Sequence, residues 1–307
     1  MAHPEPPVFR PLTGIYEPSA IRQLSDGRLL VVEDEKKHPF SLVTIDAGHV
    51  ESVALAATLL QTFSDFWKLD DLEGLALDRS GFVYAITSHS RDDEGHTRQA
   101  RERLVRFRVE GDRVVEPKVV QGLKQAMTAE HPLLAAAAEI REVKTGGGLN
   151  IEALEIDPFE HHLLVGFRSP LHEGRAIIAR IVNPTAMFEA NEEPRVSAEL
   201  DELDLDGHGI RALSFLPALG QYLVVGGPVS REPGQFSLWL WNGRGSNAVY
   251  RVAVQALRDL AHTEGVSPAT IDGAAGIVLV SDDGDRKAGR PASYLWLGLD
   301  QLQMASG

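Results

Sequence analysis

The stretch LEGLALDRSGFVYAITSHS, residues 72–90, determines the predicted fold. An apolar run follows Glu73, a turn signal stands at residues 78–81, and a second apolar run leads to a polar cluster at residues 88–90. Two short strands joined by a tight turn explain this arrangement. In such a hairpin the start of the first strand lies beside the end of the second, so the polar side chains at the two ends are expected to meet.

The same pattern recurs along the chain. The other copies are EPSAIRQLSDGRLLVVEDE (17–35), IEALEIDPFEHHLLVGFRS (151–169), IRALSFLPALGQYLVVGGP (210–228) and TEGVSPATIDGAAGIVLVSDDGD (263–285). A third apolar segment follows each copy: FSLVTI, RLVRFRV, AIIARIV, FSLWLW and SYLWLGL. Repeats of about 40 to 60 residues built from short antiparallel strands are typical of a β-propeller.

The spacing of the repeats predicts five blades. The charged key positions 17, 73, 152, 211 and 264 recur at intervals of 56, 79, 59 and 53 residues. The long interval contains an Ala-rich stretch near 121–142 with Leu133, Leu134, Ala137 and Ile140 at helical spacing, which predicts a helical insertion. Six blades is the alternative if one blade has diverged.

Residues 1–307 are predicted to form one all-β propeller domain. Only a short segment follows the last repeat, so the first 16 residues are expected to supply a strand beside SYLWLGL. Closing the ring with strands from both ends of the chain removes the open edges that promote aggregation.

Composition narrows the class of protein further. The formal net charge of −14 argues against a nucleic-acid or anionic-membrane surface. The sequence contains no cysteine, which excludes disulfides and thiolate metal ligands. The first residues show no signal-peptide pattern and no apolar run is long enough to span a membrane, so a cytoplasmic location is expected.

The repeat places one charged residue of each blade around the channel. Glu17, Glu73, Glu152, Arg211 and Glu264 are expected to form an inner ring, with Asp34, His89, Ser90, Arg168 and Asp282 just outside it. Carboxylates gathered in this way must be protonated, paired with arginine or bound to a cation. The candidate metal ligands are Glu17, Glu73, Glu152, Glu264 and Asp282, and Ca²⁺ or Mg²⁺ is the expected ion. A metal-free network of arginines and carboxylates is the alternative.

Several short motifs resemble a known family. LEGLALD, SHSR, GGLNIEAL, FRSPL, GIRAL and SDDGD, in this order, resemble the bacterial β-propeller family catalogued as domain of unknown function 3616. The resemblance implies a propeller and no established activity. The Glu-Gly openings and the Ser-Asp-Asp-Gly ending are also distantly similar to phytase-linked esterase-like propellers and to calcium-dependent lactonase propellers.

Candidate catalytic and binding groups lie in the polar clusters. His89 and Glu73 are the candidate acid-base residues, although a lone histidine in this position is also explained by a structural hydrogen bond. Arg91, Arg168 and Arg211 are the candidates for holding an anionic substrate group, or for neutralising the carboxylates. No Gly-x-Ser-x-Gly, His-Glu-x-x-His or nucleotide-binding loop is present, so no nucleotide cofactor is expected.

Two functions remain open at the level of sequence. The first is metal-assisted hydrolysis of a small ester, lactone or phosphoester at the channel mouth. The second is a non-catalytic propeller that binds a small molecule or a protein there. The fold alone does not distinguish an enzyme from a binding module.

Overall fold

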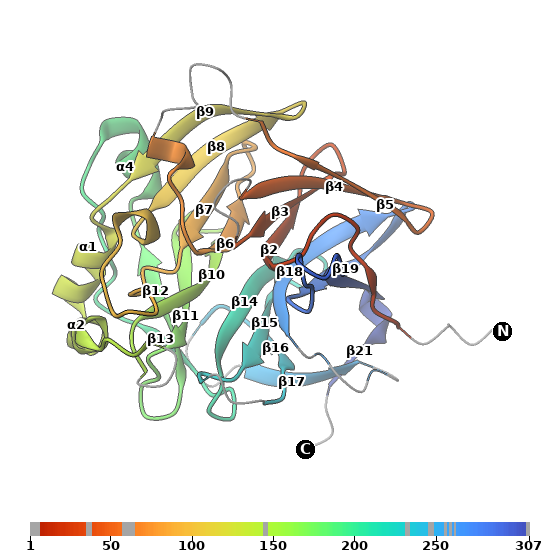
Figure 1. Cartoon of the computed structure of the whole chain (residues 1–307). Helices are drawn as coiled ribbons and strands as arrows, with labels where there is room; N and C mark the ends of the chain where they lie inside the picture. The colour runs from red at the N-terminus through yellow and green to blue at the C-terminus, as the bar shows by residue number, and fades with distance from the viewer. Residues whose placement is uncertain are drawn as a thin grey trace.

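The computed structural model describes residues 7–34, 39–56, 65–143, 147–230, 234–244, 249–254, 257, 260 and 262–304. Five antiparallel sheets surround a central channel (Figure 1), so the chain is a five-bladed β-propeller and the six-bladed alternative is wrong. Among the described residues, no helix combines the length and the apolar character needed to span a membrane.

The first three blades are meanders of four consecutive strands each. Blade 1 contains β2 (Pro18–Gln23), β3 (Leu29–Glu33), β4 (Phe40–Asp46) and β5 (His49–Ala54). Blade 2 contains β6 (Leu72–Leu77), β7 (Val83–Thr87), β8 (Leu104–Glu110) and β9 (Arg113–Val120). Blade 3 contains β10 (Asn150–Ile156), β11 (Leu163–Ser169), β12 (Ala176–Ile181) and β13 (Asp201–Leu203).

The last two blades use strands from the ends of the chain. Blade 4 contains β14 (Gly209–Leu216), β15 (Gln221–Gly227), β16 (Ser237–Trp241), β17 (Val249–Val254) and, from the C-terminal segment, β21 (Leu302–Met304). Blade 5 contains β18 (Thr263–Ile271), β19 (Ala274–Ser281), β20 (Ser293–Gly298) and β1 (Arg10–Pro11).

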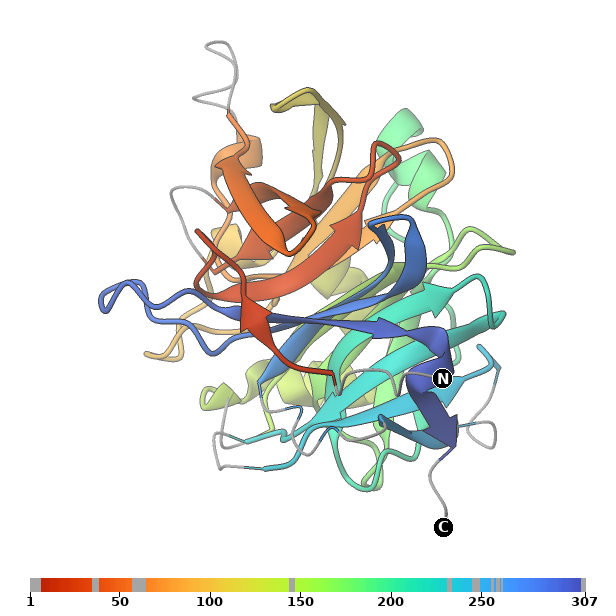
Figure 2. The ribbon, with the colours of Figure 1, turned by 90° about the vertical axis from the view of Figure 1, so that its right-hand side faces the viewer.

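The N-terminal strand forms the outer edge of blade 5. Arg10 pairs with Tyr294 and Pro11 pairs with Ser293, in antiparallel orientation. The Leu12 N–H donates a hydrogen bond of 2.7 Å to the Ala292 carbonyl, which extends the contact beyond β1. Figure 2 shows this red segment against the blue strands of blade 5. The two ends of the ring therefore meet within one sheet.

Apolar clusters fill the spaces between neighbouring blades. Between blades 1 and 2, the rings of Phe40, Phe66 and Phe107 pack with centroids 4.9 to 5.9 Å apart. Phe66 comes from a 3-10 helix, η1 (Asp65–Trp67), and all three side chains are buried. Because most strands are covered on both faces, their apolar residues form nearly continuous runs, which is the pattern that the sequence shows.

The helical insertion is present as two helices. They are α1 (Leu123–Glu130) and α2 (Pro132–Glu139), and they meet at Pro132, whose ring nitrogen cannot donate the hydrogen bond that would continue α1. Leu134 and Ala137 are buried in the cluster between blades 2 and 3. The apolar stripe of the insertion is thus covered by the propeller itself. A further helix, α4 (Pro184–Ala190), was not expected from the repeat.

One arginine crosses the channel. Arg22, near the end of β2, donates hydrogen bonds to the Ser214 hydroxyl on β14 at 2.7 Å, to the Leu75 carbonyl on β6 at 3.1 Å and to Glu155 on β10 at 2.9 Å. Glu155 also accepts a bond of 2.7 Å from the Phe215 N–H. The hydrogen bonds of Arg22 therefore link four inner strands, away from the ends at which these strands begin. We call the opposite end, where the inner strands begin, the channel mouth.

Candidate functional site

Every inner strand carries a bulge close to the channel mouth. In blade 2, Leu72 pairs with Thr87 and the next pair is Gly74 with Ile86, so Glu73 has no partner across the hairpin. The register shifts at the same place in the other four blades. The residues at the bulge are Ser19, Glu73, Glu152, Arg211 and Glu264. A bulge turns an unpaired side chain out of the sheet, and here it turns one per blade into the channel.

The bulge corrects the predicted inner ring in blade 1. Pro18 pairs with Glu33 and Ala20 with Val32, so the residue equivalent to Glu73 is Ser19 and not Glu17. Glu17 is equivalent to Asp71: the Glu17 carbonyl accepts a bond of 3.2 Å from the Asp34 N–H, and the Asp71 carbonyl accepts one of 2.9 Å from the Ser88 N–H. Glu17 therefore belongs to a second ring, one step nearer the solvent.

A cavity of about 270 Å³ occupies the channel mouth. It is lined by Glu17, Ser19, Asp34, Asp71, Glu73, Ser90, Asn150, Glu152, Arg168, Arg211, Glu264 and Asp282. All five predicted metal ligands are among these residues, together with two of the three predicted anion-binding arginines. Seven carboxylates and two guanidinium groups share one small space, so the balance of charge is strongly negative.

On one side of the cavity the charges are paired. Glu152 lies 3.1 Å from the Arg168 Nη1 and 2.8 Å from the Arg211 Nε. Arg211 also contacts Glu264 directly. Arg168 donates its remaining hydrogen bonds to the Pro228 and Ser230 carbonyls, at 3.1 and 2.8 Å. These four side chains form the arginine-carboxylate network that was the alternative to a metal site.

On the other side the carboxylates are unpaired. In the part of the chain that the structure describes, Glu17, Asp34, Glu73 and Asp282 form no ion pair. Burial raises the pKa of Asp34 to about 6, and the nearby charge of Asp71 adds to the effect. Burial also raises the pKa values of Glu73 and Asp282, with contributions from Asp71 and Glu17 respectively. We call these four residues the unpaired carboxylates.

Asp71 is a member of the site that the sequence did not identify. It has a left-handed backbone conformation, with φ of 63°, and accepts hydrogen bonds from the hydroxyls of Ser88 and Ser90. The Arg101 Nη1 lies 3.0 Å from it. The adjacent acidic pair in the sequence DDLEG was the available signal, but its arginine partner lies 30 residues further along the chain. Asp71 is thus held by local contacts and is less available to a ligand than the unpaired carboxylates.

His89 and Arg91 lie away from the cavity. The His89 side chain is fully buried, and its Nδ1 donates a hydrogen bond of 2.8 Å to the Thr87 carbonyl. Burial lowers the pKa of His89 to about 4, so the ring is neutral. Arg91 donates to the Ala138 carbonyl at 3.0 Å and thereby fastens the end of α2. These positions favour structural roles for both residues over the catalytic and substrate-binding roles expected from the sequence.

Among the described residues, one group of three side chains has metal-ligating atoms within 4.8 Å of one another. It consists of Asp92, Glu94 and His96, in an exposed loop. The Asp92 carboxylate accepts hydrogen bonds from the His96 N–H at 2.8 Å and from the Arg98 side chain at 2.5 Å, so these interactions compete with a metal ion for its oxygens. At the channel mouth, a metal ion would therefore need side-chain rotations that bring the unpaired carboxylates closer together.

The fold and the site define a five-bladed propeller with an acidic channel mouth. Residues 142–288 match the family described as "Protein of unknown function (DUF3616)", which confirms the resemblance for that part of the chain. No curated protein matches the sequence.

Solved structures with a similar fold come from diverse proteins. An exo-β-1,3-galactanase from Phanerochaete chrysosporium has a TM-score of 0.52 at 10% identity, covering 99% of this chain and 67% of that chain. A putative oxidoreductase (glucose dehydrogenase) from Thermus thermophilus has a TM-score of 0.47 at 18% identity, covering 95% and 100%. The aldose sugar dehydrogenase from Streptomyces coelicolor has a TM-score of 0.45 at 14% identity, covering 98% and 100%. At these identities the similarity concerns the propeller fold alone.

Proposed function

We propose that this protein is a cation-dependent binding propeller, in which the channel mouth holds a divalent cation and presents it to a small ligand. The observation that carries the proposal is the group of four unpaired carboxylates in one cavity of about 270 Å³. Ca²⁺ is the ion of choice because it accepts six to eight oxygen ligands in flexible geometry, whereas Mg²⁺ requires near-ideal octahedral coordination.

The electrostatics of the site support this proposal. Burial and mutual repulsion raise the pKa values of Asp34, Glu73 and Asp282, so in the absence of a cation the ionised forms are unfavourable. A bound divalent ion reverses that balance, since it attracts the carboxylates that otherwise repel one another. The hydroxyl of Ser19, at the bulge of blade 1, supplies a neutral oxygen beside them.

The ion-paired side of the cavity gives the site an asymmetry. Arg168 and Arg211 line the same cavity, where Glu152 and Glu264 balance their charges, and the Arg211 charge also reaches Glu73 and Asp282. A ligand that coordinates the cation through an oxygen therefore contacts a nearly neutral wall on its other side. This arrangement suits a small oxygen-rich molecule of low charge.

Calcium titration of the melting temperature tests the proposal. A cation present at 100 times its Kd stabilises the folded state by about 2.7 kcal/mol. With an unfolding entropy of about 0.64 kcal/mol per kelvin for 307 residues, the expected rise in Tm is about 4 °C. The Glu73→Gln variant should lose most of this response. Glu94→Gln, in the exposed loop, is the matched control and should retain it.

A Tm that does not change with calcium or magnesium, in protein first stripped with a chelator, would contradict the cation site. A response that is equal in the Glu73→Gln and wild-type proteins would place the ion elsewhere. Isothermal titration calorimetry then gives the stoichiometry, which is expected to be one.

Asp34 favours a second candidate function, metal-assisted hydrolysis of a small ester, lactone or phosphoester. Burial raises the pKa of Asp34 to about 6 in the cation-free site, and a bound cation lowers it, which leaves an ionised carboxylate that can accept a proton from a cation-bound water near neutral pH. In this scheme Asp34 takes the acid-base role that the sequence suggested for His89. Hydrolysis of an ester and lactone panel by the wild type, lost in Asp34→Asn at a calcium concentration that saturates both proteins, would support the enzyme. Activity that is unchanged in Asp34→Asn would reject this mechanism.

A further inference from the structure

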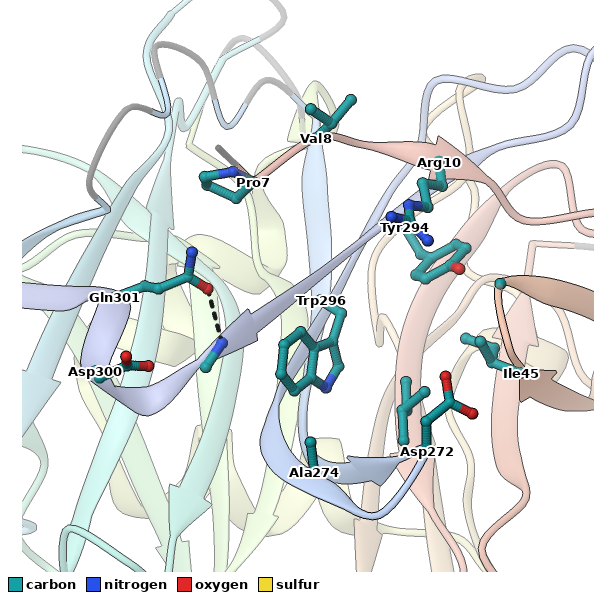
Figure 3. Close-up of a pocket in the computed structure, with 13 residues that line it drawn as sticks. Pro7, Val8, Arg10, Ile45, Asp272, Ala274, Tyr294, Trp296, Asp300 and Gln301 are labelled. Carbon is teal, nitrogen blue, oxygen red and sulfur yellow. Dashed lines mark hydrogen bonds between the residues drawn. The ribbon is translucent and has the colours of Figure 1, made fainter. Parts of the chain in front are cut away.

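A second and larger cavity lies at the seam where the ring closes. It has a volume of about 520 Å³ and is lined by Pro7, Val8, Arg10, Ile45, Gly48, Ile271, Asp272, Ala274, Tyr294, Trp296, Gly298, Asp300 and Gln301 (Figure 3). None of these residues lines the channel mouth. The two cavities are therefore separate.

Three parts of the chain build the walls of this seam cavity. The N-terminal segment contributes Val8 and Arg10, blade 1 contributes Ile45, and blade 5 contributes Trp296 and the turn between β18 and β19. Figure 3 shows the indole of Trp296 in the middle, with the N-terminal segment on one side and Ala274 on the other. Aliphatic and aromatic side chains predominate, as in most sites for small molecules.

Two acidic side chains line the same cavity as the indole. Figure 3 shows Asp272 on one side of Trp296 and Asp300 on the other. One Asp272 oxygen accepts a hydrogen bond of 3.0 Å from the Ala47 N–H, which fixes the side chain and leaves its charge in place. Asp300 forms no ion pair with any residue that the structure describes. An aromatic face bordered by two carboxylates attracts a cation, because the negative face of the ring adds to the carboxylate charges.

We propose that the seam cavity binds a small organic cation of the alkylammonium class, with its charged head on the Trp296 indole between Asp272 and Asp300. The methyl or methylene groups of such a ligand contact Ile45, Ile271 and Val8. The net charge of −14 favours the approach of a cation to the protein as a whole. Trp is also the aromatic side chain that binds ammonium groups best.

Arg10 determines which alkylammonium compounds fit. Its side chain is exposed and forms no ion pair within the described part of the chain, and it lies at the N-terminal side of the cavity in Figure 3. A ligand that carries a carboxylate at a distance from its ammonium head can place that carboxylate at Arg10. Glycine betaine has both groups, whereas choline has only the cation.

Binding of three probes by calorimetry tests the proposal. The probes are choline, glycine betaine and dimethylbutanol, the uncharged isostere in which carbon replaces the nitrogen of choline. Choline is expected to bind with a Kd of the order of 1 mM, at least ~10-fold more tightly than the isostere. Trp296→Leu should weaken choline binding by at least ~10-fold, and Asp272→Asn by ~3-fold or more. The control Glu130→Gln, which removes one exposed charge elsewhere, should have no effect.

Further variants test the roles of individual side chains in the seam cavity. Arg10→Gln should remove any preference for betaine over choline without weakening choline. If Trp296→Leu does not fold, Ala274→Leu, which adds bulk to the cavity wall, should weaken choline binding instead. Equal binding of choline and its isostere, or choline binding that is not weakened by Trp296→Leu or Ala274→Leu, would overturn the proposal. Absence of binding of both cations at about 50 mM would overturn it as well. Glu73→Gln must leave choline binding unchanged, which separates this site from the channel mouth.

Discussion

The two sides of the channel mouth predict opposite effects for one chemical change. Glu152 and Glu73 both occupy the bulge position of an inner strand. Glu152→Gln and Glu73→Gln each replace the carboxylate by an amide of the same shape. Glu152 forms two ion pairs, with Arg168 at 3.1 Å and Arg211 at 2.8 Å, and its side chain is 6% exposed. Glu73 forms none among the residues that the structure describes.

The magnitudes follow from these contacts. Removing one partner of a buried ion pair costs about 3 to 5 kcal/mol, because the remaining charge is left uncompensated. With an unfolding entropy of about 0.64 kcal/mol per kelvin for a chain of 307 residues, Glu152→Gln should lower Tm by about 5 to 8 °C. Burial raises the pKa of Glu73, so its ionised form destabilises the fold, and the neutral amide should raise Tm at pH 8.

The assay is thermal unfolding followed by circular dichroism at pH 5 and pH 8, in the presence of a chelator. The advantage of Glu73→Gln should be smaller at pH 5 than at pH 8, because the pKa of Glu73 is raised and more of the wild-type carboxyl is protonated at the lower pH. It should grow with pH as the wild-type carboxyl ionises. A stabilising Glu152→Gln, or a Glu73→Gln that lowers Tm at pH 8 as much as Glu152→Gln does, would refute the division of the cavity into paired and unpaired sides.

Three further predictions concern pH, packing and closure. Because the pKa of Asp34 is raised from 3.8 to about 6, its contribution to stability is full below pH 4 and is lost as the pH rises through 6. Asp34→Asn should flatten that decrease, by about 1 kcal/mol after allowance for solvent screening in the open cavity, as measured by denaturant titration across pH. Gly74→Ala should cost about 1 to 3 kcal/mol in the same titration, since its Cβ would lie 2.7 Å from the Leu154 nitrogen of the next blade. Deleting residues 1–11 removes the β1 pairing with β20 and should lower Tm by several degrees, and an unchanged Tm would show that this strand contributes little.

The blade count was predictable because turn signals and apolar runs are local and recur. Each hairpin pairs residues that are close in sequence, so the repeats could be aligned without knowing how the blades pack. The helical insertion was predictable for the same reason, although Pro132 divides it. Helix α4 follows strand β12 without any signal in the repeat.

The candidate site was less predictable because its geometry depends on pairing between strands. Glu17 and Ser19 flank Pro18, and only the register with β3 decides which of them occupies the bulge position. The direction of the His89 side chain could not be predicted either. Strand β7 ends at Thr87, so strand alternation no longer applies, and His89 has a positive φ of 55°. The partners of the acidic residues, such as Arg101 for Asp71, come from distant segments.

The residue at each bulge takes no part in the strand pairing, so its identity is not constrained by the register of the hairpin. In each blade the strand resumes its register one residue later, so the bulge position can accept a serine, a glutamate or an arginine with the same backbone. The strand register therefore permits substitution at five equivalent positions, while the ion pairs of Arg211 with Glu152 and Glu264 couple three of them. A library randomised at Ser19, Glu73, Glu152, Arg211 and Glu264 would sample many charge patterns of the channel mouth on one unchanged scaffold.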